Sequence, residues 1–146
     1  MNLVDANVLL YADNEAAAHH QESRSWLTAA LSGVELVLVP WLSVLAYLRV
    51  STLPQIHHHP QSVEGALRFI RTVLDAPCVV TGEPDHRYVD RVAALLSATG
   101  IGGNLVNDAH LAALALQYDA TVISYDNDFS RFPGVRWERP QGSSGN

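Results

Sequence analysis

Short apolar runs alternate along this chain with longer segments in which apolar residues recur every three or four positions. The first run lies in NLVDANVLLY, residues 2–11, and is apolar on both sides of a single carboxylate, Asp5. A short, nearly continuous apolar run is typical of a strand that is buried on both faces of a parallel sheet. Strands are predicted to end at Asp5 and to cover residues 35–39, 78–81, 121–124 and 135–137.

The longer segments have the spacing of helices. They predict helices over residues 19–31, 41–52, 63–74, 85–99 and 105–118. The stripes expected to face the core are Trp41, Leu45 and Leu48 in the second helix, and Val63, Leu67, Ile70 and Leu74 in the third. The second helix carries one charge, Arg49, so we expect it to be largely buried.

Alternation of strands with helices indicates βα units and a mainly parallel sheet. The predicted fold is therefore a three-layer α/β/α sandwich with a sheet of about five strands. The 146 residues are 48% hydrophobic and 16% charged, which suits one globular domain with a sizeable core. We assign residues 1–139 to this domain, and the small polar residues 140–146 to a flexible tail.

The sequence favours a cytoplasmic protein. No apolar run is long enough to cross a membrane, and the N-terminus has no basic region typical of a signal peptide. Cys78 is the single cysteine and cannot form an internal disulfide, in agreement with a reducing compartment. A net charge of −6 argues against non-specific nucleic-acid binding, although metal ions can still bring phosphates to an acidic site.

Three consecutive histidines lie in the loop between the second and third helices, at residues 57–59. Histidine is a common metal ligand, but consecutive side chains on a loop do not all face one ion as helical i, i+4 ligands do. We therefore favour a solvated loop over a metal site for this run.

Four aspartates lie where an α/β sheet gathers its functional groups. Asp5 ends the first strand, Asp108 begins a helix, and Asp126 and Asp128 follow the strand at 121–124. If the two strands are neighbours, the four carboxylates meet at one edge of the sheet. Carboxylates so close repel one another, and a divalent cation removes the conflict. Oxygen ligands without cysteine favour Mg²⁺ or Mn²⁺.

Each aspartate also has a local interpretation. Asp5 is a possible helix cap or turn residue, and Asn7 either caps the following helix or orients Asp5. Asp108 suits the first turn of a helix because of the helix dipole. Asp126 and Asp128 suit an Asx-type turn, and no Gly and Glu follow them at the spacing of an EF-hand. A shared site accounts for all four together.

The chain resembles the PIN-domain ribonucleases, specifically the VapC toxins of bacterial toxin–antitoxin pairs. The resemblance rests on LVDANVLLYA, NLVNDAHLAALAL and SYDNDFSRFPGVRW, with WLSVLAYLRVST similar to the family's second helix. It implies an Mg²⁺- or Mn²⁺-dependent endoribonuclease that cleaves structured RNA, tRNA or rRNA, by attack of a metal-activated water on the phosphodiester. It also implies a homodimer, and inhibition by a cognate antitoxin that binds operator DNA.

The resemblance assigns roles to individual residues. The catalytic acids would be Asp5, Asp108, Asp126 and Asp128, and the metal ligands would be Asp5, Asp108 and Asp126. Asn7 and Ser124 match the small polar positions that orient the carboxylates. Many relatives have a Glu near residues 42–44, and this chain has none between Val39 and Val50. Glu35, Glu64 and Glu83 are the candidates to replace it.

Arg49 is expected at the boundary of the acidic cleft. There it would contact substrate phosphate or the cleft acids, or neutralise a buried carboxylate.

Two other hypotheses compete with a toxin ribonuclease. One is a non-catalytic RNA- or partner-binding module with a degenerate acidic site, which would bind but not cleave. The other is a phosphatase- or receiver-like fold with Asp5 as nucleophile. That hypothesis predicts a phosphoryl-enzyme, and the chain has no lysine to pair with the phosphate.

Overall fold

The computed structural model describes residues 1–54 and 60–142. It contains a five-stranded sheet in the order β3-β2-β1-β4-β5, and every neighbouring pair is parallel. The strands are β1 (Asn2–Val4), β2 (Val37–Leu38), β3 (Val79–Val80), β4 (Thr121–Ile123) and β5 (Arg136–Glu138). β1 is the central strand and lies between β2 and β4. The histidine run at 57–59 lies outside the described residues.

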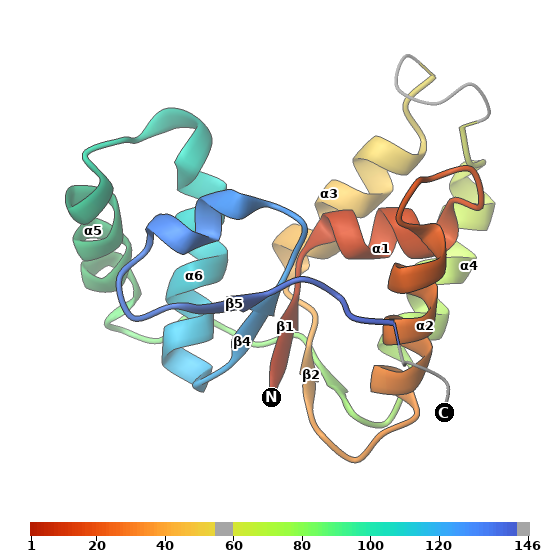
Figure 1. Ribbon diagram of the computed structural model, residues 1–146, viewed down its shortest axis with the longest axis horizontal. Coiled ribbons are helices and arrows are strands. Elements are labelled where there is room, and N and C mark those ends of the chain that lie inside the picture. The colour runs from red at the N-terminus through yellow and green to blue at the C-terminus, as the bar shows by residue number, and fades with distance from the viewer. Residues whose placement is uncertain (55–59, 143–146) are drawn as a thin grey trace.

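Helices cover both faces of the sheet, as Figure 1 shows: α5 and α6 lie on one side and α1 to α4 on the other. The helices are α1 (Ala6–Asp13), α2 (His20–Leu31), α3 (Trp41–Ser51), α4 (Val63–Leu74), α5 (Tyr88–Thr99) and α6 (Val106–Tyr118). Two short 3₁₀ helices are also present: η1 (Gly103–Leu105) precedes α6, and η2 (Asn127–Arg131) follows β4. The three-layer α/β/α prediction is confirmed.

Strand residues alternate between two apolar cores. Leu3, Leu38 and Val122 belong to the core shared with α6, whereas Val4 and Ile123 belong to the core shared with α1 to α4. Leu3 and Val4 are fully buried, because β1 is covered on both faces. Burial of this central strand fixes where its carboxyl end lies, and therefore where Asp5 lies.

Two sequence expectations about helix faces are wrong in part: Leu48, Ile70 and Leu74 pack in or against the core as predicted, but other members of the two stripes do not. Trp41 and Leu45 were expected in the core, but they are 48% and 63% exposed, while Val44 and Tyr47 are buried. In α4 the predicted stripe begins at Val63, which is 65% exposed. The residues of α4 that are buried are Ala66, Ile70 and Val73.

Apolar residues occur on more than one face of α3, so periodicity alone could not select the face that packs on α1 and α4. The second helix therefore presents part of its apolar surface to solvent.

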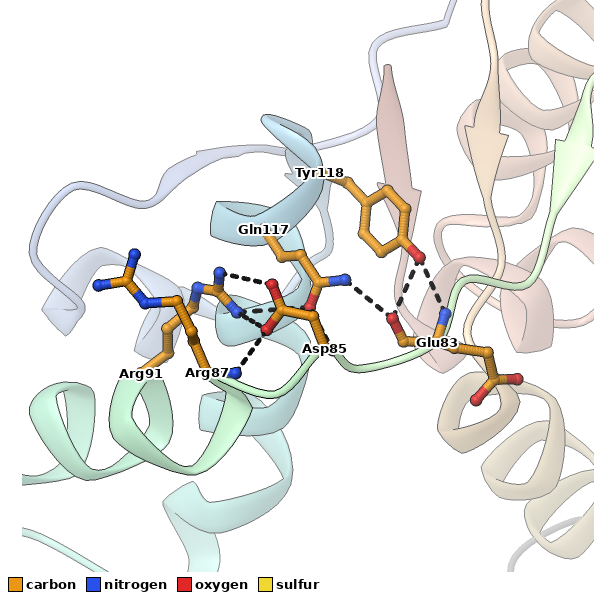
Figure 2. A network of polar contacts seen from close by, with 6 residues as sticks. All are labelled: Glu83, Asp85, Arg87, Arg91, Gln117 and Tyr118. Carbon is orange, nitrogen blue, oxygen red and sulfur yellow. Dashed lines mark hydrogen bonds and ion pairs between the residues drawn. The ribbon is translucent and has the colours of Figure 1, made fainter.

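The connection from β3 to α5 is fastened to the C-terminal end of α6, as Figure 2 shows. The Arg91 guanidinium donates to both carboxylate oxygens of Asp85, at 2.6 and 2.9 Å. The backbone N–H of Asp85 donates to the Gln117 side chain, and the Tyr118 hydroxyl donates to the Glu83 carbonyl. Because Asp85 is committed to these contacts, α5 begins at Tyr88 rather than at the predicted residue 85.

The chain packs against itself beyond its last strand. The Trp137 indole N–H donates to the Ser124 carbonyl at 3.0 Å, and Pro140 is buried. Part of the segment predicted to be a tail, 140–142, is thus described, while residues 143–146 lie outside the described part. Among the described helices, none combines the length and the apolar character that crossing a bilayer requires.

Candidate metal centre

Asp5 caps α1 and at the same time contacts the residue that follows β4. Its Oδ1 accepts the backbone N–H of Ala6 at 2.6 Å, as an N-cap side chain does. Its Oδ2 accepts the Ser124 hydroxyl at 2.6 Å and the Asn7 amide at 3.0 Å. The two interpretations of Asp5 are therefore compatible, since one oxygen serves the helix and the other faces β4.

Ser124 links the first strand to the fourth. Its side chain is fully buried, and its hydroxyl oxygen accepts the Asn7 amide at 2.9 Å and the backbone N–H of Asp126 at 3.0 Å. The Asn7 carbonyl in turn accepts the backbone N–H of Tyr125 at 3.3 Å. Asn7 therefore orients Asp5 and does not cap α1, because Asp5 is the N-cap.

Asp126 and Asp128 form a turn and are also brought toward Asp108. The Asp126 carboxylate accepts the backbone N–H of Asp128 at 2.8 Å, which starts η2. Asp128 contacts Arg131, three residues on, at 3.3 Å. The Asx-type turn predicted from the sequence is thus part of the structure that presents these carboxylates.

Asp108 reaches the pair from the first turn of α6. One carboxylate oxygen from each of Asp108, Asp126 and Asp128 lies within 4.8 Å of the others. Within residues 1–54 and 60–142, this is the one such group of metal-ligating side chains. The predicted ligand set was Asp5, Asp108 and Asp126, so the geometry adds Asp128 and leaves Asp5 beside the group.

Like charges raise the cost of ionising this cluster. Burial is the main cause that raises the pKa of Asp5, with a further contribution from Asp126. Burial together with Asp126, Asp5 and Asp128 raises the pKa of Asp108 to about 7. The neighbouring carboxylates thus disfavour ionisation of Asp108 and Asp5, and a bound cation would relieve this repulsion.

The donor set fits a hard divalent cation. The three clustered groups are carboxylates, the ligands that Mg²⁺ and Mn²⁺ prefer, and no thiolate or imidazole belongs to the described cluster. Asp108, Asp126 and Asp128 are the residues that would hold such an ion. Asp5 would add negative charge from the side of β1.

The remaining candidates lie elsewhere. Glu64 pairs with Arg68 at 3.4 Å on the exposed face of α4, and Glu35 contacts the N-terminal amine. Neither of these, nor Glu83, belongs to the described metal-ligating group. The described metal-ligating group therefore contains no glutamate that would replace the acid expected near residues 42–44.

Arg49 is exposed in the last turn of α3, and no ion pair joins it to a carboxylate in the described part of the chain. Arg131, which the sequence analysis did not single out, is the arginine that contacts the acidic cluster. The sequence feature that predicts this contact is the position of Arg131 three residues after Asp128, because residues so spaced in a helix lie side by side.

Ser43 lies in the segment where the family resemblance led us to expect a further acid. It is 1% exposed, and its hydroxyl is the buried side-chain polar atom that has no hydrogen-bond partner among the described residues. A buried hydroxyl of this kind calls for a water or another polar partner. This position in α3 therefore contributes a small neutral group where an acid was expected.

Comparison with known proteins agrees with this geometry. The PIN domain family matches residues 3–135, which is most of the chain. Ribonuclease VapC37 of Mycobacterium tuberculosis is 46% identical over 140 residues, covering 96% of this chain and 97% of the relative. Ribonuclease VapC31 of the same organism is 34% identical, covering 96% and 99%. The chain belongs to the PIN-domain family and, within it, to the VapC ribonucleases.

Solved structures share the fold. The toxin–antitoxin complex VapBC2 of Rickettsia felis, bound to a promoter DNA fragment, contains a chain that superposes with a TM-score of 0.69 and 18% identity. The match covers 94% of this chain and 97% of the other. A chain of FitAcB from Neisseria gonorrhoeae superposes with a TM-score of 0.66 and 19% identity, covering 96% and 98%. At these identities the likeness shows the fold alone.

Proposed function

We propose that this protein is a metal-dependent endoribonuclease that acts as the toxin of a toxin–antitoxin pair. The observation that carries the proposal is the group formed by Asp108, Asp126 and Asp128, whose carboxylate oxygens lie within 4.8 Å of one another. The relatives support it, since those of highest identity are named ribonucleases.

The cofactor is proposed to be Mg²⁺ or Mn²⁺. When bound, such an ion supplies Lewis acidity toward a phosphate oxygen and makes a coordinated water more acidic. The chain supplies the ligands Asp108, Asp126 and Asp128. Asp5 is held rigidly beside them by Ser124 and Asn7, so that its charge is fixed relative to the strand ends.

The substrate is proposed to be a structured RNA, with tRNA and rRNA as the candidates. A net charge of −6 gives the protein no general attraction to nucleic acid, so binding would depend on the cation and on local contacts. Arg131 lies beside Asp128 and is half exposed, which suits a contact to a phosphate next to the metal. Arg49 remains a candidate for a more distant phosphate.

The proposed partner is a cognate antitoxin that inhibits by entering the acidic cleft. Several structures with this fold are VapBC complexes, one of them on promoter DNA. An arginine of the antitoxin could pair with two or more of the clustered aspartates, because a guanidinium fork matches carboxylate geometry. Operator DNA would then be bound through the antitoxin. Co-purification with the protein encoded upstream, followed by a cleavage assay, tests this partnership.

A homodimer and a cytoplasmic location complete the proposal, and both remain predictions. Equilibrium sedimentation of the purified chain tests the dimer. Fractionation of cells that express it tests the location.

A non-catalytic binding module is the second candidate, favoured by the absence of an acid near Ser43. RNA cleavage distinguishes the nuclease from the binding module. Purified protein is incubated with total RNA and Mn²⁺ or Mg²⁺, and 5′ ends of cellular RNA are mapped after induced expression. Discrete new 5′ ends that disappear in Asp5→Asn support the nuclease, whereas RNA binding without cleavage supports the module.

A further inference from the structure

Three aromatic rings cluster beside the acidic site. The His19 and Tyr125 rings are stacked, with centroids 4.3 Å apart and planes at 20°. Tyr11 packs edge-on against Tyr125 at 5.2 Å and tilted against His19 at 5.8 Å. The rings come from α1, from the residue that precedes α2, and from the segment after β4.

The stack is tied to the acidic site through Tyr125. This residue lies between Ser124, which donates to Asp5, and Asp126, which belongs to the metal-ligating group. Its backbone N–H donates to the Asn7 side chain, and its hydroxyl bonds the buried Ser23 at 2.8 Å. Hydrogen bonds thus hold Tyr125 at its backbone and at its hydroxyl, and the backbone contact is to Asn7, which also bonds Asp5.

His19 leaves part of its ring open to solvent. Its side chain is 45% exposed, although one face lies on Tyr125. It occupies the N-cap position of α2, but its side chain makes no capping hydrogen bond there. In contrast, the Tyr47–Phe69 pair belongs to the core, and Tyr47 is fully buried. Helix capping and core packing therefore do not account for an aromatic residue at position 19.

We propose that His19, backed by Tyr125, is a stacking subsite for an unpaired nucleobase next to the phosphate that is cleaved. This inference rests on the proposed ribonuclease function and adds to it the element that receives a base. Single-stranded RNA is commonly bound by stacking of bases on aromatic side chains, histidine included. Because every base has a π face, the subsite would tolerate several sequences.

The charge around the stack selects a base rather than a phosphate. The Glu22 carboxylate is 55% exposed and lies 3.4 Å from both the His19 ring nitrogen and the Tyr125 hydroxyl. A phosphate at this point would be repelled, whereas a base can present amino groups to a carboxylate. The subsite would thus bind the base while the phosphate remains near the acids.

The test compares His19→Ala, His19→Phe and a control, His86→Ala. His86 is an exposed histidine next to Asp85, and Asp85 contacts Gln117 near the far end of α6. Gln117 lies nine residues after Asp108, a separation of about 14 Å along the helix axis. The probe is a short single-stranded RNA that carries 2-aminopurine beside the mapped cleavage point. KM and kcat are measured with Mn²⁺, and fluorescence quenching on binding is measured with Mn²⁺ and a non-cleavable analogue of the same RNA.

We expect His19→Ala to raise KM by about 5- to 150-fold, the range that corresponds to loss of one stacked base, with little change in kcat. Quenching should fall in His19→Ala, recover in His19→Phe and stay unchanged in His86→Ala. A wild-type KM and quenching in His19→Ala would overturn the inference and leave the nuclease standing. Equal losses in the Ala and Phe variants would also overturn it. A wild-type protein that neither binds nor cleaves RNA would overturn the proposed function and this subsite together.

Discussion

Ser124 donates its hydroxyl hydrogen to Asp5 at 2.6 Å, across 119 positions of the sequence. The contact is possible because β1 and β4 are parallel neighbours, with Val4 opposite Ile123. Both residues therefore follow their strands at the same level of the sheet. This pairing holds Asp5 in place beside the segment after β4, which carries Asp126 and Asp128.

Replacing the acids should abolish metal-dependent cleavage. Asp108→Asn removes a carboxylate from the proposed ligand group, and we expect a loss of at least ~100-fold in rate. Cleavage of total RNA with Mn²⁺, and with EDTA added, is the measurement. Asp90→Asn is the matched control, since Asp90 is an exposed acid in the first turn of α5. Activity that persists both in EDTA and in Asp108→Asn would contradict the site.

Ser124→Ala should displace the acidic limb of the pH–rate profile. The Ser124 hydrogen bond favours the ionised form of Asp5 and lowers its pKa, so its removal raises that pKa further. The acidic limb should move to higher pH, and the maximal rate should fall by about 10- to 100-fold, as for residues that orient ligands. Ser130→Ala is the control, because Ser130 is an exposed serine that bonds only a backbone carbonyl. A maximal rate equal to that of the wild type would mean that Ser124 does not position Asp5.

The metal-free protein should be stabilised by Asp108→Asn at neutral pH. The pKa of Asp108 is raised from 3.8 to about 7, so the native state binds more protons than the unfolded chain between these values. Its contribution to stability is therefore full below pH 4 and is lost as pH rises toward 7. After discounting for solvent screening, the gain in Asp108→Asn should be about 1–2 kcal/mol at pH 8.

Thermal unfolding in EDTA at pH 5 and pH 8 measures this gain. The Asp90→Asn variant controls for the change in net charge. A difference of equal size at both pH values would show that Asp108 is not the group that titrates.

The Asp85–Arg91 pair should protect the fold against acid. The Arg91 hydrogen bonds hold the pKa of Asp85 at about 2, so its stabilising effect is present above the usual value of 3.8 and is lost as pH falls toward 2. During acid titration, Asp85→Asn should therefore begin to unfold at a higher pH than the wild type. Circular dichroism measures this transition. Glu64→Gln, which removes an exposed pair on α4, should not shift the transition. RNA cleavage at neutral pH should be unchanged in both.

Metal and RNA should bind cooperatively. The segment at Ser43 contributes no acid, so part of the coordination is left for substrate phosphate and water, which Mg²⁺ readily accepts. Coupling between such ligands is typically ~1–3 kcal/mol and is reciprocal. Calorimetric titration of Mn²⁺ into the protein alone, and with a non-cleavable RNA analogue bound, measures it. Two tight sites of equal strength without RNA would show that another group replaces the missing acid.

The sequence alone determined the five strands and five of the helices, and with them the three-layer fold, but it did not give the bounds of α1 or the two 3₁₀ helices. Strand and helix periodicity are local properties, and both depend on residues close together in the chain. The same locality placed Asp5, Asp108 and Asp126 at the ends of elements, where parallel sheets collect functional groups. Family motifs at those points then identified the class of protein.

Only the tertiary structure decided which face of each helix is buried and which acids lie together. Tyr47 is buried and Leu45 exposed because α1 and α4 pack against one side of α3, although both sides are apolar. Asp108, Asp126 and Asp128 form the compact group, and Asp5 is turned toward Ser124, because the register of β1 with β4 sets that contact. The stacking of His19 on Tyr125 joins residues 106 positions apart, a separation across which no periodic pattern extends.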